Sequence, residues 1–148
     1  MTTDTEGFFN NTISKDLLAL VTGKYLGKGV AREVFRSALN PDHVFKFEVL
    51  SSSFQNALEW EAWDAVKRTK HAKWFCPCIH ISSCGTVLIQ RYARNIDIAE
   101  LPKEVPAFFT DLKTDNWGII DGQPVCRDYG RSLLMDRGLS NKMRKAEW

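Results

Sequence analysis

The sequence predicts an α+β fold, in which an antiparallel sheet of about five strands carries one helix and is followed by a loop-rich segment with a hairpin. Three observations predict it. Short runs of β-branched and aromatic residues alternate with glycine and proline turns between residues 23 and 93. One longer stretch, beginning near Phe54, has apolar residues at helical spacing. Asp121-Gly122 separates two further apolar runs, which is a strong hairpin signal.

Composition limits the kind of protein. The 148 residues fit one domain, and the 44% of hydrophobic residues are ample for a core. The net charge of +2 gives no broad electrostatic case for binding nucleic acid or a membrane surface. No apolar run approaches the ~18 residues of a membrane-spanning helix, and the first residues do not read as a signal peptide. We therefore expect a cytoplasmic protein.

The N-terminal segment, residues 1–22, is expected to contain a short helix, Asp16–Val21, which Ser14 would cap and Gly23 would end. From residue 24 the pattern changes to that of strands joined by turns. Asn40-Pro41-Asp42-His43 is a typical turn sequence. The strands expected here are Tyr25–Gly27, Glu33–Leu39 and Val44–Leu50.

The best helix in the sequence is expected from Phe54 to about Lys70, with Ser51 to Ser53 as possible caps. Its apolar stripe consists of Leu58, Trp60, Trp63 and Val66. Residues 93–107 contain two prolines and are expected to be irregular. Beyond residue 130 the tail is basic and could form a short helix from Ser140 onward or stay solvated. The remaining expected strands are Cys76–Ser82, Thr86–Tyr92, Trp117–Ile120 and Gln123–Arg127.

The most specific pattern lies between Asp111 and Gly130. It consists of Asp111-Leu112-Lys113-Thr114-Asp115-Asn116 and, after the predicted hairpin, Asp128-Tyr129-Gly130. This pattern resembles that of protein kinases, whose catalytic loop reads D-L-K-x-x-N and is followed, after a small hairpin, by D-F-G. The alternative is that these residues are simply turn formers, but the order and spacing of the whole set favour the kinase-like interpretation.

The resemblance implies a role for each of these side chains. Asn116 and Asp128 would hold Mg²⁺, because this ion prefers carboxylate and amide oxygens. Asp111 would accept or orient the proton of an attacking hydroxyl, and Lys113 would reach the transferring phosphate of ATP. Phosphoryl transfer depends mainly on positioning and on neutralising phosphate charge, which such a set can provide.

The N-terminal half contains further kinase-like motifs in the expected order. Gly27-Lys28-Gly29-Val30-Ala31-Arg32-Glu33-Val34 resembles the glycine-rich loop G-x-G-x-x-G-x-V. Gly27 and Gly29 would let backbone amides approach the phosphates without a Cβ clash. Arg32 stands where the third glycine is usual, and its guanidinium could touch a phosphate.

Lys46 lies in the middle of an apolar strand, where a buried lysine needs an anionic partner. The resemblance implies that Lys46 holds the α- and β-phosphates and pairs with a glutamate of the following helix. Glu59 and Glu61 are both candidates, and Glu59 is favoured because Trp63, one turn later, would then face the core. Alternatively, Lys46 lies on a solvent face and both glutamates are surface charges.

The segment Thr86–Ala93 resembles the strand that leads into the kinase hinge. Gln90 would then be the gatekeeper, and the backbone around Tyr92 would meet the adenine. Leu26 and Val34 would cover the base. These assignments follow from the resemblance alone, because any apolar strand could be placed here.

The resemblance divides one domain into a helical segment (residues 1–22), an N-lobe-like part (23–93), a catalytic and metal-binding loop remnant (94–130) and a basic tail (131–148). Asp111 follows Ala93 after only 18 positions, which cannot hold the two helices that kinases place there. Phe109-Thr110 replaces the usual His-Arg, and no A-P-E element follows Gly130. We therefore expect a minimal C-lobe remnant. Such short proteins resemble those encoded by bacteriophages, which would act in the host cytoplasm.

Two functions remain open. The first is a minimal ATP-dependent phosphotransferase that acts on a small molecule, on itself or on a bound partner, since every side chain for handling Mg-ATP is present. The second is a pseudokinase that binds a partner or host protein without catalysis, which the departures from the kinase pattern favour. The oligomeric state does not follow from the sequence.

The four cysteines suggest a further, weaker hypothesis. Cys76, Cys78, His80 and Cys84 could form a zinc site. The C-x-C spacing and the lack of a second well-spaced pair argue against it, and buried free thiols are the more common outcome.

Overall fold

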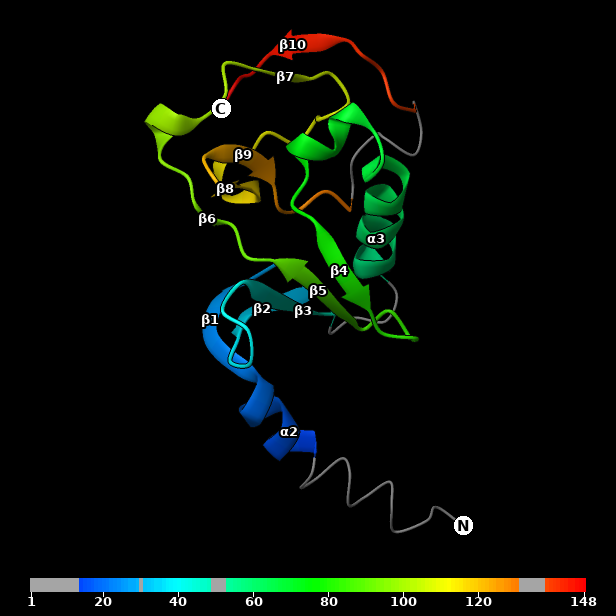
Figure 1. Cartoon of the computed structure of the whole chain (residues 1–148), viewed down its shortest axis with the longest axis vertical. Helices are drawn as coiled ribbons and strands as arrows, with labels where there is room; N and C mark the ends of the chain where they lie inside the picture. Colours follow the sequence, from blue (N-terminus) through cyan, green and yellow to red (C-terminus); the bar gives the residue numbers. More distant parts are fainter. Residues whose placement is uncertain (1–13, 30, 49–52, 131–137) are drawn as a thin grey trace.

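The computed structural model of the chain describes residues 14–29, 31–48, 53–130 and 138–148 (Figure 1). It confirms the predicted α+β class: two helices, a five-stranded antiparallel sheet and two small antiparallel sheets occupy the described part. None of the helices described has the length and apolar character needed to cross a bilayer. Val30 and the proposed caps Ser51 and Ser52 lie outside the described residues.

The five-stranded sheet has the order β1-β2-β3-β5-β4. Its central strand β3 places Lys46 opposite Val34 of β2 and Leu88 of β5, so these three side chains share one face. The next pair on that face is Val44 with Gln90. The strands are β1 (Thr22–Lys28), β2 (Arg32–Ser37), β3 (His43–Glu48), β4 (Cys78–Ile81) and β5 (Val87–Arg91).

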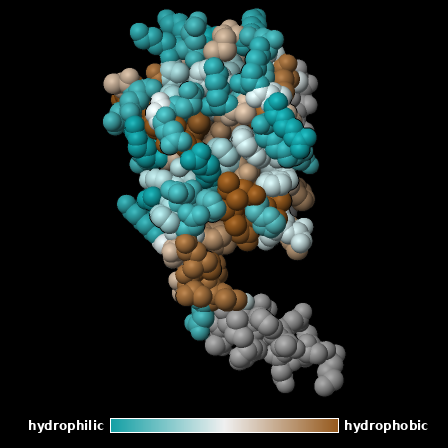
Figure 2. All heavy atoms as spheres, in the orientation of Figure 1, coloured by the Kyte–Doolittle hydropathy of each residue, from teal (hydrophilic) through white to brown (hydrophobic). Residues whose placement is uncertain are grey.

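The first helix, α2 (Ser14–Val21), runs directly into β1. The prediction that Gly23 ends this helix is therefore wrong, because Gly23 is a strand residue. A Cβ at Gly23 would lie 3.0 Å from the backbone oxygen of Arg36 on β2, so close strand packing explains the glycine. Figure 2 shows the apolar surface of α2 standing clear of the body, and its exposed residues include Leu17 and Leu20.

The second helix, α3 (Gln55–Val66), is shorter than the sequence suggests. It ends where the Thr69 hydroxyl donates to the Val66 carbonyl over 2.8 Å and accepts from the backbone nitrogen of His71, which opens the 3₁₀ helix η2 (Lys70–Trp74). Its first turn is capped by the Glu48 carboxylate, which accepts from the backbone nitrogen of Gln55 over 2.6 Å.

The buried face of α3 also differs from the predicted apolar stripe. Leu58 is exposed, whereas Trp60 and Trp63 are only partly buried and pack against the core. The face turned inward instead carries polar and charged side chains, because the sheet below it presents buried cations. The buried residues are Asn56, Glu59, Ala62 and Val66.

Two small sheets follow. Strands β6 (Arg94–Asn95), β8 (Trp117–Ile120) and β9 (Gln123–Cys126) form one of them, and β7 (Glu104–Pro106) pairs with β10 (Met143–Lys145) in the other. The predicted hairpin is confirmed: Asp121 and Gly122, with φ of 49° and 78°, form its turn. The short helix considered from Ser140 is wrong, because this segment pairs with β7 as a strand.

An aromatic cluster forms the main core and holds together α3, β4 and the small sheets. The ring of Phe75 lies 4.9 Å from that of Tyr129, and the ring of Phe109 lies 5.2 Å from that of Trp117. Tyr129 follows Asp128 directly, and Phe109 comes two residues before Asp111. The core therefore anchors both loops that carry the predicted acidic site residues.

Candidate functional site

A cavity of about 740 Å³ opens between the five-stranded sheet and the loops on either side of the β8–β9 hairpin. Its lining contains every predicted site residue except Glu59, which is fully buried behind Lys46. The predicted residues in the lining are Gly27, Gly29, Val34, Lys46, Gln90, Tyr92, Asp111, Lys113, Asn116 and Asp128. Residues that are distant in the sequence thus meet around one space of a size suited to a small-molecule ligand.

Lys46 and Glu59 form a buried ion pair at the inner end of the cavity. The Lys46 Nζ lies 2.7 Å from the Glu59 Oε1 and also donates to the backbone oxygen of Arg127. Glu61 is exposed on the opposite side of α3. The prediction that Lys46 pairs with Glu59 is confirmed, and the alternative with Lys46 on a solvent face is excluded.

Gln90 completes this inner cluster. Its side-chain nitrogen donates to Glu59 over 3.1 Å and to the backbone oxygen of Cys76 over 3.3 Å. The side chain is almost fully buried, at 1% exposure. Gln90 therefore fixes the position of the glutamate as well as lining the cavity.

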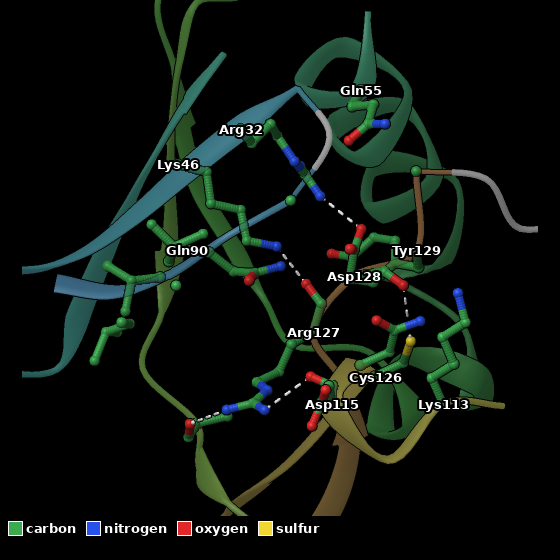
Figure 3. A pocket seen from close by; sticks show the side chains of 18 of the residues that line it. Arg32, Lys46, Gln55, Gln90, Lys113, Asp115, Cys126, Arg127, Asp128 and Tyr129 are labelled. Carbon is green, nitrogen blue, oxygen red and sulfur yellow. Dashed lines mark hydrogen bonds and ion pairs between the residues drawn. The ribbon is translucent and has the colours of Figure 1, made fainter. Parts of the chain in front are cut away.

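Arg32 is the residue whose importance the sequence did not reveal. It opens β2 and is buried, with its guanidinium directed into the cavity toward Asp128 (Figure 3). Nη2 lies 2.6 Å from the Asp128 Oδ1, while Nη1 donates to Glu59 and, over 3.2 Å, to Asn56. The sequence marked Arg32 only as an arginine in place of the third glycine. The residues that it contacts come from α3 and from the chain after β9, which are distant from it in the sequence.

The charges of this cluster stabilise one another. Burial by itself would raise the pKa of Glu59, but the nearby charges of Arg32 and Lys46 and their hydrogen bonds outweigh it, so the pKa lies below its usual value. Burial would lower the pKa of Arg32, but Glu59 and Asp128 outweigh it and raise the pKa. Arg32 and Glu59 are therefore both charged at neutral pH.

The hairpin brings the two predicted metal ligands together. Its open end is closed by a hydrogen bond from the backbone nitrogen of Arg127 to the backbone oxygen of Asn116 over 2.6 Å. Asp128 is the next residue, so Asn116 and Asp128 lie at adjacent strand ends and both line the cavity. Asn116 also donates a long hydrogen bond, of 3.4 Å, to the carboxylate of Asp111.

These two side chains suit Mg²⁺ in donor type, since one supplies a carboxylate and the other an amide oxygen. Asp128 is half exposed, with 52% of its side chain accessible, and one of its oxygens already accepts from Arg32. No group of three or more His, Cys, Asp or Glu with the arrangement of a metal site occurs in the described residues.

The predicted catalytic residues Asp111 and Lys113 lie at the exposed mouth of the cavity. The Lys113 Nζ is 3.9 Å from the Asp111 Oδ2, and their side chains are 75% and 60% exposed. Both are within reach of a ligand in the cavity because they line it. Neither side chain is buried in the core, although Phe109 anchors the loop that carries them.

Arg127 is a second residue that the sequence did not single out. Its guanidinium donates to the backbone oxygens of Ala93 and Asp115, over 3.2 and 2.9 Å, and to the Asn95 side chain over 3.1 Å (Figure 3). It thereby joins the chain around β6 to the 3₁₀ turn η4 (Thr114–Asn116) that precedes β8.

The cysteines do not form the proposed zinc site. Cys76, Cys78 and Cys126 are buried free thiols, whereas Cys84 is exposed. The Cys76 thiol donates to the backbone oxygen of Arg91 over 3.0 Å, and the Cys78 sulfur lies 3.2 Å from the Tyr129 hydroxyl. Burial raises the pKa of both of these thiols to about 12, so they are protonated at neutral pH.

Comparisons with known proteins add no assignment. No protein-family model matches the sequence, and no curated protein matches it. The resemblance to protein kinases therefore stays a prediction. A functional proposal has to be based on the cavity and on the charged residues that line it.

Proposed function

We propose that this protein binds ATP in the cavity between the sheet and the hairpin loops, as a small kinase-like protein. One observation supports this above all. Residues of separate kinase-like motifs, each with its own expected task in handling ATP, line a single cavity, and Lys46 and Asp128 are among them.

The adenine would lie between the glycine turn and the end of β5. Leu26 and Val34 would cover one face of the base, and the backbone around Tyr92 would meet its edge. The phosphates would extend inward, toward Lys46. At Gly27 an added Cβ would meet no atom within 4 Å, so packing does not require this glycine. A close approach of phosphate to the backbone would explain it.

Mg²⁺ is the metal that the proposed function implies. In a kinase-like site Asn116 and Asp128 would hold it, and it would neutralise phosphate charge. Here one oxygen of Asp128 already accepts from Arg32. The protein's own contribution is the placement of these two side chains by the hydrogen bond between Arg127 and Asn116.

Phosphoryl transfer is a second candidate function, favoured by the position of Asp111. Its exposed carboxylate lies at the cavity mouth beside Asn116 and Lys113. Asp111 would take the proton of an acceptor hydroxyl as its oxygen bonds to the γ-phosphorus. The bond from that phosphorus to the bridging oxygen would break, releasing ADP. The acceptor could be a small molecule, the protein itself or a bound partner.

Binding without transfer is the alternative that Arg32 favours. Its guanidinium neutralises Asp128, the carboxylate on which a kinase-like reaction would depend. A pseudokinase of this kind would use the nucleotide-bound form to contact a partner protein, which would be a host protein if the chain is phage-encoded.

Calorimetric titration with Mg-ATP tests the proposed function. We expect saturable binding by the wild type and weaker binding by Lys46→Ala, which removes a cation from the cavity wall. Lys67→Ala, at the exposed C-terminal end of α3, should bind as the wild type does. No binding by the wild type would refute the nucleotide site. Incubation with γ-labelled ATP then separates the two candidates: label on the protein or on a lysate component, lost in Asp111→Asn, supports transfer, and binding without label supports the pseudokinase.

A further inference from the structure

We infer that the cavity binds a nucleoside triphosphate without a divalent cation, because the Arg32 guanidinium already holds the place at Asp128 that a cation would take. The inference rests on the proposed function. It concerns the ion requirement of that site and assigns Arg32 as the residue that sets it.

Arg32 is built into the cavity wall. Its two terminal nitrogens contact three acceptors: Asp128 at 2.6 Å, Asn56 at 3.2 Å and the Glu59 carboxylate. The Arg32 side chain is only 5% exposed. A planar guanidinium with this many fixed partners has a single arrangement, unlike a solvated surface arginine.

The inner charges of the cavity balance without any ion. Arg32 and Lys46 supply two positive charges, and Glu59 and Asp128 supply two negative charges. A cation that coordinated Asp128 would meet the guanidinium at the same carboxylate, and the two positive charges would repel each other. If Arg32 left instead, the buried Glu59 would keep only Lys46 as a cationic partner, which is costly for a charge with no exposure.

The rest of the cavity wall already favours a polyanion. Seven Lys or Arg residues line it, against three Asp residues. An ATP molecule usually needs Mg²⁺ in kinase-like sites because the acidic ligands there would otherwise repel its phosphates. Here the acidic residue nearest the phosphates is neutralised by the protein, so the cation is not required for affinity.

Titrations of ATP into the wild type, with EDTA in one arm and excess Mg²⁺ in the other, test this inference. We expect dissociation constants that agree within about threefold. Arg32→Gly restores the usual glycine and frees Asp128, so Mg²⁺ should then strengthen ATP binding by at least about tenfold. Arg68→Gly, which removes an exposed arginine beyond α3, should keep the wild-type ratio. Mn²⁺ alone, followed by the loss of its free paramagnetic resonance signal, should bind Arg32→Gly and not the wild type.

Each outcome decides the matter. Binding of ATP by the wild type only in the presence of Mg²⁺ would overturn the inference and leave the proposed function intact. Absence of binding in both arms would overturn both. If Arg32→Gly does not fold, the two titrations of the wild type still decide. Arg32→Lys keeps the positive charge but loses the planar, bidentate guanidinium, so its ATP binding should show an intermediate dependence on Mg²⁺. If Arg32→Lys and the wild type both bind ATP only with Mg²⁺, Arg32 does not set the ion requirement and the inference is wrong.

Discussion

The guanidinium of Arg144 donates two hydrogen bonds to the backbone oxygen of Phe109, from Nε over 3.1 Å and from Nη2 over 2.6 Å. Phe109 lies two residues before Asp111, so a residue of β10 fixes the start of the loop that carries this predicted catalytic residue. The pairing of β10 with β7 and a hydrogen bond from the Trp148 indole to the Pro102 oxygen, over 2.9 Å, hold this strand in place.

Replacement of Arg144 by Ala should therefore lower the free energy of unfolding by about 1–2 kcal/mol, because the carbonyl of the buried Phe109 loses a charged donor. Urea unfolding measures this change. Lys145→Ala is the matched control, since Lys145 lies next to it on the same strand but is exposed, and it should stay within about 0.5 kcal/mol of the wild type. Equal effects of the two substitutions would refute the anchoring role of Arg144.

Glu59→Gln should be among the most destabilising single substitutions. It removes the carboxylate that two buried cations share, and a loss of about 3–5 kcal/mol is expected. Glu61→Gln, on the exposed side of the same helix, should change stability by less than about 0.5 kcal/mol. Thermal and urea unfolding of the two variants would show whether the buried ion pairs of Glu59 contribute this much to the free energy of unfolding.

The buried carboxylate of Glu59 should also make the free energy of unfolding depend on pH. The folded pKa of Glu59 lies below the value of about 4.3 expected for the unfolded chain, so its carboxylate stabilises the fold above that pH. This stabilisation is lost as the pH falls through the folded pKa. The gap in unfolding free energy between the wild type and Glu59→Gln should therefore shrink below about pH 4. A gap that stays constant down to pH 3 would contradict the assignment.

Substitution by alanine should affect stability at one glycine of the site and ATP binding at another. A Cβ at Gly130 would lie 2.8 Å from the backbone oxygen of Gln55, so Gly130→Ala must displace α3 or the Asp128 segment and should cost about 1–3 kcal/mol. A Cβ at Gly27 would meet nothing within 4 Å. Gly27→Ala should leave stability within about 1 kcal/mol of the wild type but weaken ATP binding. Unfolding curves and ATP titrations separate the two effects.

The thiols should differ sharply in reactivity. Cys84 is exposed, whereas burial raises the pKa of Cys76 and Cys78 to about 12. Because the thiolate is the reactive form, iodoacetamide at pH 8 should modify Cys84 first in the folded protein. Peptide mass spectrometry over time would measure this order. Rapid modification of Cys76 or Cys78 would show that the core around them opens easily.

Much of the fold could be predicted because its signals are local. The run of β-branched and aromatic residues around Phe45 and Phe47 identifies β3, and Asp121-Gly122 identifies the hairpin turn. The strand pattern alone left open whether Lys46 faces solvent or the core. The partner of Lys46 followed from the resemblance to kinases, which places it on the next helix, where Glu59 and Glu61 were the candidates.

The features that escaped prediction depend on contacts between distant residues. Arg32 finds Asp128 at a separation of 96 positions, and nothing near Arg32 in the sequence marks it as buried. β10 is too short to show a strand pattern and is defined by its pairing with β7. The cap of α3 is supplied by Glu48 of the preceding strand, whereas the local sequence offers only the serines next to the helix.

Chemical-shift mapping of the backbone amides during an ATP titration tests the proposed nucleotide site most directly. We expect saturable shifts at the cavity residues Gly27, Lys46 and Asp128, with the amides of α2 unchanged. Shifts confined to surfaces outside the cavity, or no shifts at saturating ATP, would contradict the assignment of this cavity as a nucleotide site.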